Sequence, residues 1–265
     1  MKNSNKLIKD AWLNIDAQDD SDLFNPLNFN REDFHLKLTW VMMQPEYFYF
    51  ICKEILNIEL LPVQALMLQE IWQRKFPMLI ASRGFGKSFI LSVYAILRCL
   101  LMPGRKIIVV GAAFRQSKIL FEYMDTIWKN APLLRDIVGS EGGPRRDVDM
   151  CRMHIGSSTV TCLPLGDGSK IRGQRANDII ADEFASIPRE IFENVVAGFA
   201  AVTASPVENV KYIAAKKRAE ELGQEIYLED DEVLSHGNQI ILSGTAFYDF
   251  NHFSEYWKKW RSIIQ

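Results

Sequence analysis

The chain has 265 residues, 48% of them hydrophobic and 24% charged, a composition typical of a globular protein with one large domain or two small ones. Its formal net charge of −2 excludes a generally basic surface, so a nucleic-acid partner would need a local basic patch. The longest mostly apolar segment, residues 89–102, is too short to span a bilayer. The four cysteines form no C-x-x-C pair, which favours reduced core residues over a disulfide framework or a metal centre.

Residues 1–60 are predicted to form a helical N-terminal section, with a soft boundary to an α/β body at 61–265. The body begins with a predicted helix over 62–74, which has a proline in its first turn. Gln64 carries an amide with both a donor and an acceptor, which suits the edge of an adenine ring. The alternative is an ordinary surface glutamine.

A short apolar run at 78–81 is followed by a loop with two glycines and then by a long, mostly apolar segment. Glycines let the backbone approach a phosphate, and the first turn of a following helix adds free N–H donors. The signature G-x-x-x-x-G-K-[ST] is met except at its first position, where Ala81 replaces glycine. Lys87 is predicted to reach the β- and γ-phosphates of a nucleotide, and the Ser88 hydroxyl to bind Mg²⁺.

We call residues 81–88 the phosphate loop. The alternative is a helix that merely begins after a glycine turn, and the agreement of the flanking strand and helix patterns with the loop disfavours it. The residues predicted to contact the nucleotide are Ser82, Arg83, Gly84, Phe85, Gly86, Lys87 and Ser88.

Downstream of the phosphate loop, apolar runs alternate with helical patterns. Strands separated by helices of 10–15 residues indicate βαβ units, so we expect an α/β fold with a mostly parallel sheet flanked by helices. Ligands of such sheets bind at the carboxyl ends of the strands. Strands are predicted at 106–111, 158–163, 178–181 and 239–243, helices at 88–102, 116–130, 188–199, 206–222 and 251–264, and a loop at 139–144.

The predicted strand at 178–181 is followed by two adjacent acids, Asp182 and Glu183. Unpaired buried carboxylates are costly, so acids at this position need a reason, which Mg²⁺ and a water molecule supply. Asp182 is predicted to hold the metal, directly or through water, and Glu183 to orient and deprotonate an attacking water. The alternative is a helix N-terminus whose dipole favours acids, since a helix is predicted from Pro188.

The strand at 239–243 leads into Ser243, Gly244 and Thr245, whose hydroxyls would sense the γ-phosphate, although Ser-Gly-Thr is also a common turn. An arginine that neutralises the γ-phosphate is worth ~10³–10⁵ in rate. Arg83 in the phosphate loop and Arg172 before the acidic strand are the candidates, with a surface arginine as the alternative for each.

In order and approximate spacing, these motifs resemble those of the large terminase subunits of tailed bacteriophages. An arginine inside the phosphate loop and an Arg-Gly pair ten residues before the acids make the resemblance more specific than a phosphate loop alone. The matching residues are Gln64, the loop at 82–88, Arg172 with Gly173, Asp182 with Glu183, and the motif at 243–245.

The resemblance implies a P-loop NTPase of the ASCE, RecA-like kind that uses ATP and Mg²⁺ to pump double-stranded DNA into a procapsid. It implies a homo-oligomeric ring on the portal protein, a small terminase subunit as partner, and a monomer in isolation. The expected location is the host cytoplasm, with no role for a membrane and no place in the mature virion.

The resemblance also implies a role for each matching position. Gln64 takes the adenine role, and Ser243 to Thr245 couple hydrolysis to movement. Arg83 lies near the phosphates in cis, and Arg172 is the candidate finger that reaches a neighbouring subunit's nucleotide. The roles inferred above for Lys87, Ser88, Asp182 and Glu183 agree with the family's.

One departure concerns the nuclease domain that family members usually carry at the C-terminal side. The sequence ends one predicted helix after the motif at 243–245, so we expect an isolated ATPase domain that cleaves no DNA. Two groups of basic residues are candidates for contacts with DNA phosphates, with a solvated helix face as the alternative for the first. They are Lys211, Lys216, Lys217 and Arg218 on the helix at 206–222, and Arg145 and Arg146 beside the glycine-rich loop.

Two other functions are compatible with a phosphate loop. A helicase-type motor needs a second RecA-like domain, for which 265 residues leave no room. A nucleotide-dependent assembly switch would bind ATP without working as a motor.

Overall fold

The computed structural model describes residues 42, 44–147, 150–164, 176–193, 238–245 and 251–264. Contacts divide the chain into a unit at 1–47 and a larger compact unit at 48–265. In the first unit, the short helix η1 (Pro45–Tyr47) is described; all other elements below belong to the second. The domain boundary near residue 60 stays a prediction.

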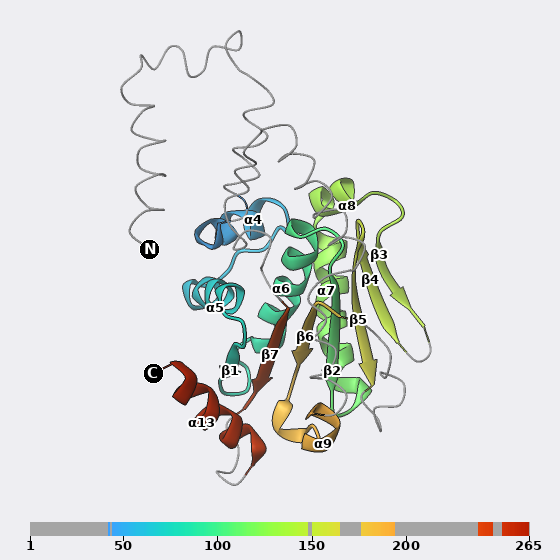
Figure 1. Cartoon of the computed structure of the whole chain (residues 1–265). Helices are drawn as coiled ribbons and strands as arrows, with labels where there is room; N and C mark the ends of the chain where they lie inside the picture. Colours follow the sequence, from blue (N-terminus) through green and yellow to red (C-terminus); the bar gives the residue numbers. More distant parts are fainter. Residues whose placement is uncertain are drawn as a thin grey trace, which may run out of the picture. The chain divides into compact units, whose positions relative to one another are not determined.

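The larger unit is built on one seven-stranded sheet (Figure 1). The five strands on one side pair in parallel and the last two pair antiparallel, so the expected mostly parallel sheet is confirmed. The strand order is β1 (Met78–Ile80), β7 (Gln239–Gly244), β6 (Asp178–Ala181), β2 (Lys106–Gly111), β5 (Ser158–Pro164), β4 (Cys151–Ile155) and β3 (Gly143–Arg146).

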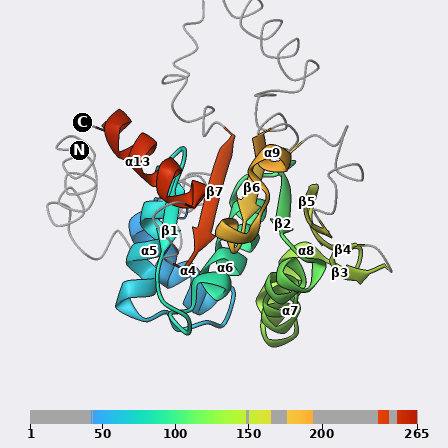
Figure 2. The ribbon, with the colours of Figure 1, turned by 90° about the horizontal axis from the view of Figure 1, so that it is seen from below.

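Helices cover both faces of this sheet. Figure 2 shows α6 and α7 on one side of the strands, and α9 and α13 on the other. The helices of this unit are α4 (Phe48–Glu54), α5 (Pro62–Gln73), α6 (Lys87–Leu101), α7 (Phe114–Asn130), α8 (Pro132–Val138), η2 (Phe184–Ser186), α9 (Arg189–Ile191) and α13 (His252–Ile264).

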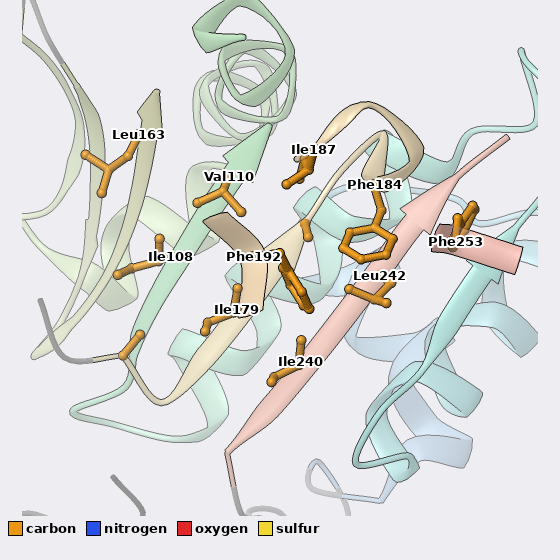
Figure 3. Packing of buried hydrophobic residues seen from close by; sticks show 12 residues of the cluster. Ile108, Val110, Leu163, Ile179, Phe184, Ile187, Phe192, Ile240, Leu242 and Phe253 are labelled. Atoms are coloured by element: carbon orange, nitrogen blue, oxygen red, sulfur yellow. The ribbon is translucent and has the colours of Figure 1, made fainter. Parts of the chain in front are cut away.

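The core has a layer on each face of the sheet. On one face, α6 is buried along almost its whole length because it lies between the sheet, α5 and α7. On the other face, apolar side chains of β2, β6 and β7 pack against η2, α9 and α13 (Figure 3). All four cysteines are buried and free, as predicted. Within the described residues, no helix has the length and apolar character needed to cross a membrane.

The region at 132–155 differs from the prediction. The predicted helix at 116–130 ends at Asn130 as expected, but Pro132 then begins a further helix, α8, because a proline at the first helical position needs no N–H partner. Arg145 and Arg146 do not lie beside a loop; they belong to β3, which pairs with the unpredicted β4. Gly143, with φ of +104°, starts this edge strand, and a β-carbon added there would lie 2.9 Å from the Trp128 ring.

The predicted helix at 188–199 is described only to residue 193, where α9 ends at Ile191. The predicted helix at 206–222 lies outside the described residues.

Candidate active site

The phosphate loop connects β1 to α6 in the predicted way. Gly84 and Gly86 have φ of +81° and +86°, a conformation that is costly for residues with a side chain. Gly86 is the N-cap of α6, and a β-carbon there would lie 3.1 Å from Nε2 of Gln64. Both glycines are therefore required by the backbone path, and the second also by its close neighbour.

Lys87 begins α6 and is only 6% exposed. Its ammonium group donates hydrogen bonds to the carbonyl oxygens of Ala81 at 2.7 Å and Ser82 at 3.0 Å. The side chain thus folds back across the loop, which holds its positive charge against the loop's backbone.

Ser88 meets Asp182 across 94 residues of sequence. The Ser88 hydroxyl donates a hydrogen bond of 3.0 Å to Oδ2 of Asp182. Asp182 directly follows β6, and its N–H donates to the carbonyl of Val110 on β2 at 3.0 Å, which extends the ladder by one residue. The phosphate loop and the acidic strand therefore converge, although β7 separates β1 from β6 in the sheet.

Asp182 is 3% exposed, and burial raises the pKa of its carboxyl group. The Ser243 and Ser88 hydroxyls, the Glu183 backbone and the Lys87 charge each lower this pKa, but burial dominates. The Ser243 hydroxyl lies near enough to Asp182 to lower this pKa, but it is not placed so as to form a hydrogen bond with the carboxylate. Within the described residues, three buried oxygens at this edge have no hydrogen-bond partner: Asp182 Oδ1, Ser243 Oγ and Thr245 Oγ1.

Glu183 has a left-handed backbone, with φ of 49° and ψ of 48°. This conformation costs a residue with a side chain ~1–2 kcal/mol and occurs preferentially at functional sites. It turns the chain out of β6 into η2 directly after Asp182.

Gln64 lies at the phosphate loop, because its Nε2 is the atom that a β-carbon added to Gly86 would meet. Its Oε1 accepts a hydrogen bond of 3.0 Å from the N–H of Leu61, which caps the start of α5. The structure thus gives Gln64 a capping contact as well as a place beside the loop; its adenine role stays a prediction.

The candidate arginines have different settings. Arg83 is exposed in the phosphate loop, and its guanidinium forms no ion pair within the described part of the chain. Ser82 and Phe85 are also exposed on this loop. Arg172 and Gly173 lie outside the described residues, as do Lys211, Lys216, Lys217 and Arg218.

Arg145 and Arg146 point to opposite faces of the sheet, because they are consecutive residues of a strand. Arg146 forms an ion pair with the buried Asp125 and lies 5.4 Å from the centre of the Phe121 ring, so it packs on α7. Arg145 lies opposite Arg152 of β4 and donates to the Glu141 carbonyl at 3.2 Å. The structure therefore separates the pair that the sequence presented as one basic group.

The oxygens at this edge fit Mg²⁺ bound together with a nucleotide. Mg²⁺ is usually held by one or two protein oxygens, phosphates and waters rather than by a complete protein cage. Asp182 offers a buried oxygen without a partner, and Ser88 lies beside it. Correspondingly, the described residues hold no group of three acidic, histidine or cysteine side chains that would bind a metal by itself.

Sequence reasoning missed the partners of this edge. Phe184 is buried directly after Glu183, and Asn251 and His252 bind the turn that it begins. The available signal was an aromatic residue directly after the acidic pair. Arg152 and His154, which lie on β4 near Arg145, were not among the predicted basic residues because the β4 strand itself was not predicted.

Comparison with known proteins gives one family. Residues 78–204 match the family described as terminase large subunit, T4likevirus-type, N-terminal. No curated protein matches the chain.

Solved structures provide a likeness of fold. The large terminase of bacteriophage HK97 is 14% identical with a TM-score of 0.53, over 84% of this chain and 42% of that one. The large terminase ATPase domain of Thermus phage P74-26 is 15% identical with a TM-score of 0.43, over 78% of this chain and 88% of that one. The N-terminal domain of the DNA packaging ATPase from bacteriophage phi29 is 14% identical with a TM-score of 0.41, over 73% and 83%.

The chain spans less than half of the HK97 large terminase, whose fold it shares. The strand order, the phosphate loop and this likeness identify a P-loop NTPase fold. On this fold, residues 78–204 are similar to the N-terminal region of T4likevirus-type terminase large subunits.

Proposed function

We propose that this protein hydrolyses ATP with Mg²⁺ and uses the energy to move double-stranded DNA into a procapsid. The observation that carries the proposal is the 3.0 Å contact between Ser88 and Asp182, beside the Lys87 ammonium in the phosphate loop. The match of residues 78–204 to the N-terminal region of terminase large subunits supports the same reaction here.

Each residue of the edge has a defined part in this reaction. Lys87 and the loop N–H groups bind the phosphates, and Ser88 and Asp182 hold Mg²⁺. When bound there, Mg²⁺ would supply positive charge against the charge that develops on the transferred phosphoryl group. Glu183 orients the attacking water and accepts its proton. Gln64 reads adenine from its place beside Gly86.

The remaining roles follow the family pattern. Arg83 neutralises phosphate charge in cis, and Arg172 does so from a neighbouring subunit. Ser243 and Thr245 respond to the γ-phosphate, which is consistent with buried hydroxyl oxygens beside Asp182 that have no partner in the described residues. A homo-oligomeric ring on the portal, a small terminase subunit and the host cytoplasm complete the proposal.

Two substitutions test the chemistry. Lys87→Ala should abolish turnover and weaken nucleotide binding, because it removes the cation that contacts the phosphates. Glu183→Gln should retain binding and lower turnover by ~10²–10⁴, the usual contribution of a general base. Phosphate release and the binding of a fluorescent ATP analogue measure the two quantities. Equal loss of binding in both variants would contradict this division of roles.

A basic face on β3, β4 and β2 is the proposed contact with DNA. Register places Arg145 opposite Arg152, and His154 in the neighbouring row with Thr159 and Lys106. The alternate residues Cys151, Met153 and Ile155 are buried on the opposite face. Burial lowers the pKa of His154 most, and the positive charges of Arg145 and Arg152 lower it further, so the two arginines act on this part of the sheet together. Cations in such a row suit the phosphates of a DNA backbone.

Salt titration tests this face. Each neutralised phosphate contributes ~0.9 to the slope of log affinity against log salt concentration. The double variant Arg145→Ala, Arg152→Ala should therefore bind duplex DNA more weakly with a shallower slope. Arg146→Ala is the matched control, because that arginine is paired with Asp125 on the other face and should affect stability but not the slope. An unchanged slope in the double variant would move the contact to the basic residues at 211–218.

The alternatives separate by their response to partners. A motor should show ATPase stimulation by DNA or portal, whereas an assembly switch should not.

The absence of nuclease activity is also a proposal, and incubation of the chain with plasmid, Mg²⁺ and Mn²⁺ tests it against a Glu183→Ala preparation.

A further inference from the structure

Phe184, the residue directly after Glu183, is fully buried in a socket of aromatic rings. Figure 3 shows it between Phe192 and Phe253, beside the end of β7. Its ring makes edge-to-face contacts with Phe192 at 4.7 Å, His252 at 5.0 Å, Tyr256 at 5.4 Å and Phe253 at 5.6 Å between ring centres. Three of these four rings belong to α13, so this helix supplies most of the socket.

The start of α13 also binds the backbone of the turn that follows Glu183. His252 Nε2 lies 3.2 Å from the Phe184 carbonyl oxygen, which it reaches as an N–H donor. Asn251 donates from Nδ2 to the Ala185 carbonyl at 3.1 Å, and its Oδ1 accepts from the N–H of Phe253 at 2.9 Å. Asn251 therefore caps α13 and at the same time ties the helix to η2.

A second set of contacts joins α13 to α9. Arg189 donates to Glu193 at 2.9 Å and to Glu255 at 2.8 Å, while the Tyr256 hydroxyl donates to Glu193 at 2.8 Å. These groups are largely exposed, so each contributes little stability, but together they link α13 to the segment that follows η2.

Glu183 is held from both sides of its strained backbone. Before it, the N–H of Asp182 is bonded to β2; after it, Phe184 is fixed in the socket. The side chains that would bind phosphate and metal, Lys87 and Ser88, belong to α6 and make none of the socket contacts described above. The socket therefore holds the backbone on the far side of Glu183 from Asp182, and it does so without a contact to Lys87 or Ser88 among those described above.

We propose that Phe184 is a positioning residue for Glu183, and that α13, through its aromatic socket and its bonds to η2, determines whether Glu183 is held where it can act on water. The proposal rests on the proposed function, since it gives α13 control over hydrolysis but not over nucleotide binding. A shift of α13 would slow hydrolysis while bound ATP stays in place.

The test compares two buried phenylalanines in the full chain. Phe184→Leu should lower the turnover number by about 10- to 100-fold, the scale of a misplaced catalytic group, with nucleotide affinity unchanged. Phe121→Leu is the control, because Phe121 is equally buried but packs near Arg146, away from the socket. The proposal is overturned if both variants lose turnover to the same extent, or if Phe184→Leu weakens nucleotide binding in parallel.

A second pair of variants separates the hydrogen bond from packing. His252→Leu removes the donor to the Phe184 carbonyl, whereas His252→Gln keeps an N–H donor. We expect His252→Leu to increase amide hydrogen exchange at 182–187 but not at 81–88, with recovery in His252→Gln. Hydrogen exchange can be measured without ATP turnover, so it tests whether the socket holds the turn after Glu183 even if the isolated chain is inactive. No change at 182–187, or an equal change at 81–88, would overturn the proposal.

Different results would contradict the proposed function and the positioning role of Phe184. If Lys87→Ala and Glu183→Gln leave turnover unchanged, the proposed function is wrong. If they abolish it while Phe184→Leu behaves like Phe121→Leu, the function stands and only the positioning role falls.

Discussion

The strand β6 has a buried aspartate at each end, and the two are bound very differently. Asp178 begins the strand, fully buried, and accepts hydrogen bonds from Arg98 at 3.3 Å, Arg105 at 3.4 Å and the N–H of Gln239 at 3.1 Å. Asp182 follows the strand, accepts one hydrogen bond from a serine, and has a second oxygen without a partner in the described residues.

The amino end of the sheet is a structural junction. Gln239 of β7 donates to the carbonyls of Trp72 and Arg74 at the end of α5, and accepts a hydrogen bond from Tyr94 of α6. The Arg98 guanidinium lies 4.7 Å from the centre of the Trp72 ring. These contacts tie α5, α6, β6 and β7 together with partners from the protein itself.

Burial alone therefore does not distinguish a structural carboxylate from a functional one. Both aspartates are buried, but one has its charge neutralised by two arginines and the other faces unpartnered hydroxyl oxygens. Unpartnered buried atoms occur at both ends, since Nη1 and Nη2 of Arg98 also lack a hydrogen bond in the described residues. A carboxylate oxygen without a partner, however, is found at Asp182, at the carboxyl end of parallel strands, where ligands of such sheets bind. Substitutions at these positions test the distinction.

Asp178→Ala should destabilise the protein by about 3–5 kcal/mol, because it leaves the Arg98 charge buried and uncompensated. Urea unfolding of the full chain measures this change. The matched control is the double variant Asp178→Leu, Arg98→Leu, which removes both charges and should cost less than the single change. If the single variant is as stable as the natural protein, Asp178 is not the structural member of the pair.

Asp182→Asn should change stability in the opposite direction. We expect it to raise the free energy of unfolding of the metal-free protein by about 1 kcal/mol, the scale of desolvating a polar group. A carboxyl whose pKa is raised on folding stabilises the protein at low pH and loses that contribution as the pH rises through its folded pKa. The gain in the variant should therefore be present at neutral pH and vanish in acid, and ATP turnover should be lost. Thermal unfolding across a pH series measures it; a loss of stability at neutral pH would mean that Asp182 is a structural residue.

Ser243→Ala should cost little stability, because its buried hydroxyl makes no hydrogen bond within the described residues that the substitution could remove. Its turnover should nevertheless fall if the hydroxyl responds to phosphate. Gln239→Leu, at the other end of the same strand, is the contrasting variant and should cost more, since it removes bonds to α5. Equal costs at both ends would remove the distinction drawn between them.

Much of this edge was predictable because its signals are local. A strand, a glycine loop and a lysine occupy eleven consecutive residues at 78–88, and an apolar strand with two acids occupies seven at 177–183. The predicted strand at 106–111 has the same bounds in the structure, since a continuous β-branched run leaves little choice. The antiparallel strands β3 and β4 were not predicted, because each mixes apolar and basic residues and their pairing is set by a partner strand.

The residues alone indicate which chemical groups the protein has and that these groups follow strand ends: Lys87, Ser88, Asp182 and Glu183. Only the tertiary structure decided that Ser88 meets Asp182, that Asp178 four residues earlier is a structural ion partner, and that Arg145 and Arg146 face opposite ways. It also decided that α13 encloses Phe184. The physical reason is that strand and loop propensities act over a few residues, whereas strand order, register and helix packing join residues far apart in the chain, and no local pattern encodes them.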